Sequence, residues 1–280
     1  MAKLLNAGIW SLPIIKSIAT QRQIWRETIP LAGVDKKGKS RSRRGSRPAG
    51  NKARRFSLRQ LLKRLFILLV VIGLVPIVLT LIYIPASVHP VSTLMVKNWL
   101  VGSDVHRKWV PLEDISPFVY QSIVSSEDGQ FCFHNGVDWA AVNLVVDDLI
   151  EGERPRGAST IPMQTVKNLF LWPNRSYVRK VLEVPLALYA DLVWSKHRMM
   201  EIYLNIAEWG PGRYGIEAAA RHHFKKSAKQ LTRRQAALLA VTLPNPIARN
   251  PRKPGRGMGR LARLVEKRAK QSGAYVKCLR

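Results

Sequence analysis

The feature that most limits how this chain can fold is a run of 21 residues without a charged side chain, from Leu65 to Pro85. At the rise of an α-helix such a run reaches about 30 Å, which is the thickness of the hydrocarbon core of a bilayer. The run is apolar on every side, unlike the surface helix of a soluble domain. Gly73 and Pro76 are tolerated in a membrane helix. We therefore expect one membrane-spanning helix at 65–85, too long and too far from the first residue for a cleaved signal peptide.

Positive charge is concentrated just ahead of this run. The chain has 280 residues with 46 Lys and Arg against 18 Asp and Glu, a formal charge of +28, and residues 36–64 supply +13 of it without one acidic side chain. We expect residues 1–64 to form a basic, largely disordered arm, whose first 35 residues suggest no role. Basic residues beside a span stay in the cytoplasm. The N-terminus is therefore expected in the cytoplasm and the domain in the periplasm, at the inner membrane of a bacterium.

The chain beyond the span predicts a helical domain. We expect a linker at 86–112, the domain at 113–250 and a basic C-terminal tail at 251–280. No alternating strand pattern, internal repeat, Gly-rich phosphate loop or metal-ligand spacing stands out. The charge left after the arm is +15, which suits a polyanionic partner such as nucleic acid, anionic lipid or a phosphorylated substrate. The fold class predicted is all-α.

Local signals predict the helices nearest the polar motifs. Ser159 can cap a helix that runs through Leu171, with Pro162 near its start. Ser176 opens a long helical pattern that reaches about Trp209 and is expected to kink at Pro185. Thr232 and Gln235 form a capping-box pattern ahead of another helix.

The two cysteines, Cys132 and Cys278, are far apart in the sequence and have no metal-ligand spacing. In an oxidising compartment the two could form a disulfide. We favour unpaired thiols.

The most informative stretch is 116–136. Ser116 suits an N-cap, Pro117 suits the first helical position, and Gly129 can end the helix. Val119, Tyr120, Ile123 and Val124 recur at helical spacing and predict a core face. Glu127 falls on this face at the negative end of the helix dipole, so burial and the dipole are both expected to raise the pKa of its carboxyl. This suits a general base near neutral pH, whereas a glutamate that points into solvent at a helix end would have no such role.

Two sets of polar residues follow Glu127 along the chain. The first shares one helical face: Gln164, Lys167 and Asn168. The second can meet on one helix surface: Arg179, Lys180 and Glu183. Amides and cations side by side bind anions, although a solvated helix face or a plain helix ion pair has the same pattern.

These motifs, taken in order, resemble a known family. The first is Glu-Asp-x-x-Phe-x-x-His-x-Gly, present as Glu127, Asp128, Phe131, His134 and Gly136. The second motif is present as Gly157, Ala158, Ser159, Thr160, Ile161, Gln164, Lys167 and Asn168. The third is Arg179, Lys180 and Glu183, and the fourth is Glu201, Tyr203, Leu204 and Asn205. The fifth spans 215–221. The chain from about 116 to 250 resembles the monofunctional peptidoglycan glycosyltransferases, or biosynthetic peptidoglycan transglycosylases, whose catalytic domain also occurs in bifunctional penicillin-binding proteins. Ala158 replaces a glycine of the family pattern, and Pro162–Met163 replace a polar pair.

The resemblance implies a lysozyme-like, two-lobed helical domain behind a single span. It implies that lipid II is polymerised into glycan strands: the 4-hydroxyl of the acceptor sugar attacks C1 of the donor, the configuration inverts, and undecaprenyl diphosphate leaves. Glu127 would be the general base and Glu183 the second catalytic carboxylate, which orients the cations or holds a divalent ion. The implied substrate-binding residues are Ser159, Gln164, Lys167, Asn168, Arg175, Arg179 and Lys180.

The resemblance also implies partners. Lipid II, the growing glycan strand, membrane lipids and proteins of cell-wall synthesis are expected, and nucleic acid is not. Magnesium or manganese at the diphosphate is left open, and no cross-linking (transpeptidase) activity is expected. Two other readings are a lytic enzyme that uses Glu127 as an acid and a membrane-anchored scaffold without catalysis. The lytic reading leaves the cations unexplained, and the scaffold leaves Glu127 and Glu183 unexplained.

Overall fold

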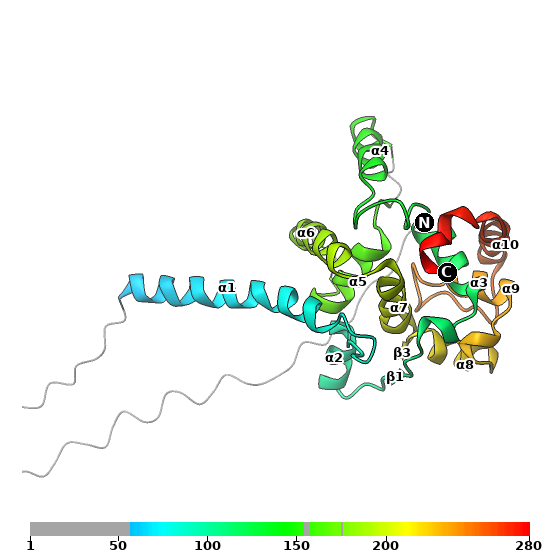
Figure 1. Cartoon of the computed structure of the whole chain (residues 1–280), viewed down its shortest axis with the longest axis horizontal. Helices are drawn as coiled ribbons and strands as arrows, with labels where there is room; N and C mark the ends of the chain where they lie inside the picture. Colours follow the sequence, from blue (N-terminus) through cyan, green and yellow to red (C-terminus); the bar gives the residue numbers. More distant parts are fainter. Residues whose placement is uncertain (1–56, 154–156, 175) are drawn as a thin grey trace, which may run out of the picture. The chain divides into compact units, whose positions relative to one another are not determined.

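The computed structural model describes residues 57–153, 157–174 and 176–280. The expected disordered arm lies almost wholly outside these residues, as does Arg175. The first element is α1 (Leu58–Ile82), the one helix of the described residues that is long and apolar enough to cross a membrane (Figure 1). It begins before the predicted span and includes Pro76, and Thr80 Oγ1 donates to the Pro76 carbonyl at 2.7 Å.

The segment that follows α1 is fastened to the domain. Trp194 Nε1 donates to the carbonyl of Thr80 at 2.8 Å. The Arg198 guanidinium donates to the carbonyls of Tyr83 at 3.1 Å and Val88 at 2.5 Å. Part of the expected linker also forms a helix, which packs on the domain. The exit of α1 is therefore held against the junction of two domain helices.

The domain is mainly helical, as expected. Its helices are α2 (Thr93–Leu100), α3 (Pro117–Glu127), α4 (Trp139–Ile150), α5 (Ile161–Phe170), α6 (Tyr177–Val193), α7 (Lys196–Ile206), α8 (Ile216–Phe224), α9 (Arg233–Ala240) and α10 (Arg256–Gln271), with short 3-10 turns η1 (Leu112–Asp114), η2 (Ala228–Gln230) and η3 (Ala274–Leu279) (Figure 1). α3 packs against α9 and α10, and α5 packs against α6 and α7. Every residue from Arg198 to Ile206 is buried, so α7 forms the centre of the core.

The predicted core face of α3 is confirmed, because Val119, Tyr120, Ile123 and Val124 are all buried. Ser116 occupies the N-cap position without a capping bond, since its hydroxyl donates to the Leu231 carbonyl at 3.0 Å.

Two local helix predictions are wrong. Thr160, not Ser159, caps α5: its hydroxyl accepts from the Met163 amide at 3.3 Å, while Ser159 Oγ is engaged by Lys180. The long helix predicted from Ser176 is two helices, because the chain is extended at Trp194 and Ser195. The Ser195 hydroxyl caps α7 and accepts from the Arg198 amide at 3.1 Å. The apolar residues on both sides of Ser195 continue at helical spacing, so the sequence pattern did not show that one helix ends and another begins there.

Three short strands were not predicted. They are β1 (His106–Arg107), β2 (Glu208–Gly210) and β3 (Arg213–Tyr214), in the order β1-β3-β2, with β1 parallel and β2 antiparallel to β3. Strands of two or three residues are too short for alternation to be read. The hairpin ends at Gly215, whose φ is +80° and whose Cβ, if present, would lie 2.9 Å from the Asn205 carbonyl oxygen.

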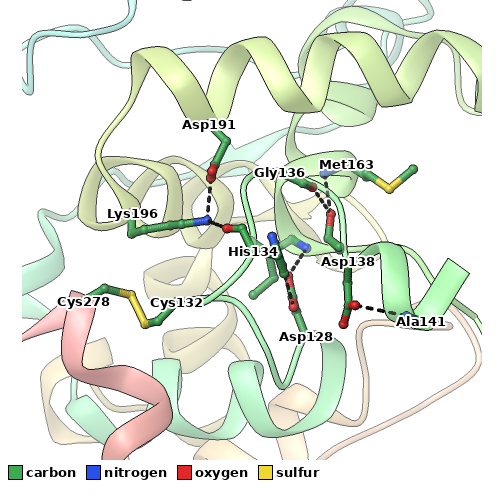
Figure 2. Close-up of polar contacts among 12 residues, drawn as sticks. Asp128, Cys132, His134, Gly136, Asp138, Ala141, Met163, Asp191, Lys196 and Cys278 are labelled. Carbon is green, nitrogen blue, oxygen red and sulfur yellow. Dashed lines mark hydrogen bonds and ion pairs between the residues drawn. A yellow bond between two sulfur atoms is a disulfide. The ribbon is translucent and has the colours of Figure 1, made fainter.

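The C-terminal segment is packed, not a free tail. Ala262 and Val265 of α10 and Val276 and Leu279 of η3 belong to the hydrophobic core. This packing brings Cys278 to Cys132, with Cα atoms 5.7 Å apart, and the two form a disulfide (Figure 2). The expectation of unpaired thiols is therefore wrong, because two cysteines that are far apart in the sequence are brought together by the packing of the C-terminal segment.

Candidate active site

Glu127 is the last residue of α3 and is half-buried. Its carboxylate accepts hydrogen bonds from Ser126 Oγ at 3.1 Å and from Gln164 Nε2 at 3.3 Å. Burial raises the pKa of the Glu127 carboxyl above its ordinary value, although these two donors and the positive charges of Arg249 and Lys167 act in the opposite direction. A carboxylate in these surroundings is suited to accept a proton near neutral pH. The side chain does not point freely into solvent.

Gln164 of α5 fixes the orientation of that carboxylate. Its amide nitrogen donates to Glu127, and its amide oxygen accepts from the Tyr203 hydroxyl at 3.1 Å. Tyr203 is buried in α7, and burial raises its pKa well above the ordinary value, so the phenol remains a donor. Because the amide oxygen must face the phenol, the NH₂ group faces Glu127. Three helices thus hold one carboxylate in place.

Asp128 joins the end of α3 to the start of α5. Its carboxylate accepts from the Ile161 amide at 2.9 Å and lies 2.9 Å from His134 Nε2 (Figure 2). Ile161 is the first residue of α5, the helix that carries Gln164. This contact therefore fixes the distance between Glu127 and the amide that orients it.

The loop after Asp128 is packed against α6 and α7. Lys196 Nζ donates to the carbonyl of His134 and to Asp191, in both cases at 2.7 Å (Figure 2). Gly136 has a φ of +84°, and a Cβ there would lie 2.6 Å from the Ala187 carbonyl oxygen. The glycine of the first motif is thus required by both the backbone conformation and the close approach of α6.

A cavity of about 230 Å³ lies beside these residues. Its wall includes Gln164, Lys167 and Asn168 of α5, with Tyr203 and Glu208 from the other side. Glu127 does not line the cavity but is hydrogen-bonded to Gln164, which does. The volume is below the range usual for a site that encloses a whole ligand, so it suits one part of a larger substrate.

Lys167 places a positive charge at this cavity. It is half-buried, and among the described residues it has no hydrogen-bond or ion-pair partner. Burial lowers the pKa of its ammonium, with the charge of Arg179 acting in the same direction and that of Glu127 opposing it. An anion in the cavity would supply the missing partner.

A second cluster is built around Glu183 of α6, which is buried. One carboxylate oxygen accepts from Arg179 and the other from Lys180 Nζ at 3.1 Å. Lys180 also donates to Ser159 Oγ at 2.6 Å, and the Arg179 side chain donates to the Asn174 carbonyl at 2.9 Å. Burial, followed by the charges of Arg179 and Lys167, lowers the pKa of Lys180 to about 8.

The structure groups the predicted residues into two sets. Glu127, Gln164, Lys167 and Asn168 lie at or beside the cavity, and Ser159, Arg179, Lys180 and Glu183 form the second cluster. The charge of Lys167 acts on Glu127 and on Lys180, so it connects the two sets. Arg175 lies outside the described residues.

Sequence reasoning missed three residues at the site. Arg249 acts on its carboxyl, Tyr203 acts through Gln164, and Glu208 lies on the cavity wall. Tyr203 belongs to a motif found in the sequence, and that was the available signal. Arg249 and Glu208 have no local pattern that marks them.

A half-buried carboxylate near partly buried cations, on a helical domain behind an apolar helix, is the arrangement of an enzyme that transfers a group from an anionic donor. Comparison with known proteins agrees with this class. The transglycosylase family model matches residues 94–270, a stretch that begins in the expected linker and ends in the expected tail.

Several sequences named biosynthetic peptidoglycan transglycosylase are similar to the chain. One from Mesorhizobium japonicum is 62% identical over 226 residues, which is 80% of this chain and 96% of the relative. One from Rhizobium johnstonii is 58% identical over 224 residues (80% and 91%), and one from Brucella suis is 62% identical over 213 residues (76% and 95%). The chain belongs to the transglycosylase family, and the mainly helical, lysozyme-like fold that the resemblance implied is confirmed.

Proposed function

We propose that this protein is a peptidoglycan glycosyltransferase that polymerises lipid II into glycan strands and releases undecaprenyl diphosphate. The observation that carries the proposal is the placement of Glu127, which is oriented by a neutral amide and acted on by the charge of Lys167, a side chain without a partner in the described part of the chain. A base and an anion-binding group within reach of one another serve the two ends of a glycosyl transfer. The names of the similar proteins support the same substrate class.

In the proposed reaction, the 4-hydroxyl of the acceptor sugar attacks C1 of the donor sugar. The new C–O bond forms as the bond from C1 to the diphosphate oxygen breaks, and the configuration at C1 inverts. The hydroxyl proton passes to Glu127, whose raised pKa matches that task. The leaving diphosphate carries away the electron pair.

The cations are proposed to stabilise the departing diphosphate. Lys167 is at the cavity, and Lys180 lies in the second cluster with Arg179, so both sets can contact one extended anion. Ser159 and Asn168 are proposed to donate hydrogen bonds to the donor, and Gln164 to hold Glu127. A role for Arg175 at the diphosphate also remains a proposal.

Glu183 is proposed to position cations. One of its carboxylate oxygens accepts a hydrogen bond from Arg179 and the other accepts one from Lys180. The described residues contain no group of three or more His, Cys, Asp or Glu side chains that could hold a metal ion. This donor set does not fit a divalent ion held by the protein alone. We therefore assign no step of the reaction to a metal.

We also propose where the reaction takes place. The helix α1 supports anchoring in a membrane, and the basic residues ahead of it favour a cytoplasmic N-terminus and a periplasmic domain at the bacterial inner membrane. Trp194 and Arg198 hold the C-terminal end of α1 against the domain, so the cavity would stay at a fixed height above the bilayer. A substrate that is itself anchored in the outer leaflet then needs to diffuse in two dimensions only.

The test is incubation of the detergent-purified full chain with labelled lipid II, followed by separation of the products by size. Growth of glycan strands with release of the lipid diphosphate supports the proposal. Cleavage of added strands without growth would instead assign the protein to lytic enzymes, with Glu127 as an acid. Neither reaction, in a preparation shown to be folded, would reject both.

A further inference from the structure

The proposed reaction makes no use of the basic C-terminal helix. Five cations of α10 recur at spacings of four, three, four and three residues and are all exposed: Arg256, Arg260, Arg263, Lys267 and Lys270. Such spacing places them on one face of the helix, along about 21 Å at the α-helical rise. We call this row the α10 stripe.

The α10 stripe opposes the stability of its own helix. Like charges three or four residues apart on a helix repel one another, and none of the five has an ion-pair partner among the described residues. The helix is held instead by the opposite face, where Ala262, Val265 and Ala269 are buried against the domain. Some exposed cations elsewhere are paired, as Arg221 is with Glu217 and Lys229 with Asp114, whereas the α10 stripe brings five cations without such a pair onto one helix face of the described residues.

A hollow of about 310 Å³ is lined in part by α10, through Arg268 and Gln271, which directly follow Lys267 and Lys270 of the α10 stripe in the sequence. It is lined by Ser125 and Gly129 from the end of α3 and by Arg268, Gln271 and Tyr275 from the C-terminal segment. We call it the α3–α10 hollow. Its lining combines an aromatic ring, an amide and a guanidinium, which suits a polar ring such as a sugar. Gly129 lies two residues after Glu127, so a ligand here would touch the turn next to the proposed base.

The walls of the hollow are fixed to one another. The Cys132–Cys278 disulfide joins the loop after Gly129 to η3, the turn that carries Tyr275 (Figure 2). The rings of Phe133 and Tyr275 meet edge to face with centroids 5.7 Å apart, and both side chains are largely exposed. The hollow is therefore preformed, which lowers the entropy cost of binding.

We propose that the α3–α10 hollow and the α10 stripe together form a second binding site for a peptidoglycan strand, separate from the catalytic cavity. Sugar rings occupy the hollow, and the free carboxylates of the peptide stems lie along the stripe. The proposal rests on the proposed function, because a strand with such stems is the product of that reaction. It explains why five cations without an ion-pair partner among the described residues share a helix with the lining of the α3–α10 hollow.

An anionic membrane surface fits these features less well. Helices that bind membranes insert an apolar face below the headgroups. The face of α10 that carries Ala262, Val265 and Ala269 is covered by α3 and α9. The large apolar side chains left for insertion are the partly exposed Leu261 and Leu264, which is a small area beside five charges. A flat headgroup layer would also leave the α3–α10 hollow unused.

The experiment measures the affinity of the detergent-purified full chain for soluble, uncrosslinked peptidoglycan strands that carry a fluorescent label. The double variant Arg263→Gln/Lys267→Gln is expected to bind about tenfold more weakly, since two exposed charge contacts are lost. The matched control, Lys225→Gln/Lys226→Gln, also removes two exposed positive charges, but from the loop after α8, and is expected to bind like the unaltered protein. Thermal melts establish that both variants are folded.

Two further comparisons separate the stripe from the hollow. Strands whose stems have been removed by an amidase should bind the unaltered protein as weakly as intact strands bind the stripe variant. The variant Arg268→Ala/Gln271→Ala, which alters the hollow, should weaken binding of both kinds of strand. The rate of the first transfer between two lipid II molecules should stay unchanged in the stripe variant, because none of its altered residues lies at the cavity.

Equal affinity of the stripe variant and the unaltered protein for intact strands would overturn the proposal. So would a stripe variant that keeps its affinity for strands but loses affinity for vesicles of phosphatidylglycerol, a result that would assign α10 to the membrane. Failure of the proposed function has a different outcome: the unaltered protein would bind strands yet form none from lipid II. Polymerisation without strand binding at α10 would reject this inference alone.

Discussion

Glu127 and Glu183 are carboxylates of the same domain in opposite surroundings. Glu127 is half-buried, and its two hydrogen-bond donors, a hydroxyl and an amide, are neutral. Glu183 is buried, and its two donors, Arg179 and Lys180, are cations. Burial leaves the first carboxyl with a raised pKa although its two donors oppose the shift, so that it can take up a proton.

The difference teaches that two carboxylates in one motif set need not share one task. A carboxylate held by two cations keeps its charge and gains nothing by moving a proton. What Glu183 can do is hold Arg179 and Lys180 close together against their mutual repulsion. Glu127 is then the chemical group and Glu183 the positioning group, and the following predictions test that division.

The largest effect is expected from Glu127→Gln. An amide of the same shape cannot accept the proton, so the rate of polymerisation should fall by about 10²–10⁴. The unaltered protein loses stability as the pH rises through the raised pKa of Glu127, because the fold disfavours the charged form. The variant avoids that loss, so its melting temperature near neutral pH should be equal or higher. Retained activity would remove Glu127 from the role of base.

The second effect is expected from Glu183→Gln, and here stability should fall. The substitution leaves Arg179 and Lys180 next to one another without a counter-charge, and breaking a buried ion pair in this way costs about 3–5 kcal/mol. Chemical denaturation measures the change in the free energy of unfolding. A variant as stable as the unaltered protein but inactive would contradict the positioning role and would favour direct chemistry by Glu183.

The third effect is expected from Lys167→Ala. The ammonium is unpaired among the described residues and is proposed to meet the diphosphate, so its loss should lower kcat/KM for lipid II by about 10–100-fold, the range of one charge-assisted hydrogen bond. Lys97→Ala, at an exposed lysine of α2, is the matched control and should have no effect. If both variants polymerise at the same rate, Lys167 does not contact the donor.

Much of this arrangement could be predicted from the sequence. Helical spacing gave the core face of α3 and placed Glu127 at its end, and the motif order indicated the family. Those signals are local, since they depend on residues three or four apart. The pairing of Arg179 and Lys180 with Glu183 is of this kind.

Long-range contacts could not be predicted in the same way. The Gln164 contact with Glu127 joins two helices, and the Cys132–Cys278 disulfide joins residues 146 positions apart. Arg249 acts on Glu127 from a loop that no motif marks. Each of these depends on how the helices pack, and a period in the sequence states only which face of a helix is buried.

The smallest effect is expected in the pH dependence of kcat/KM, where Glu127 should govern one limb and Lys180, a partner of Glu183, the other. On the acid side the rate should fall as Glu127 takes up a proton, with a midpoint above 4.5, the ordinary carboxyl value. On the alkaline side it should fall as Lys180 loses its proton near pH 8. Lys180→Arg, which keeps its charge, should remove the alkaline limb and leave the acid limb in place.

Stability should change in the opposite direction over the alkaline range, which separates loss of a charge from loss of the fold. The pKa of Lys180 is lowered from 10.5 to about 8, so between these values the unfolded chain binds more protons than the folded one. The free energy of unfolding contributed by this group therefore rises with pH while kcat/KM falls. Because the Lys180 side chain is 43% exposed, solvent screening keeps the gain small. A melting temperature that falls together with activity above pH 8 would show that the alkaline limb reports unfolding instead of the Glu183 cluster.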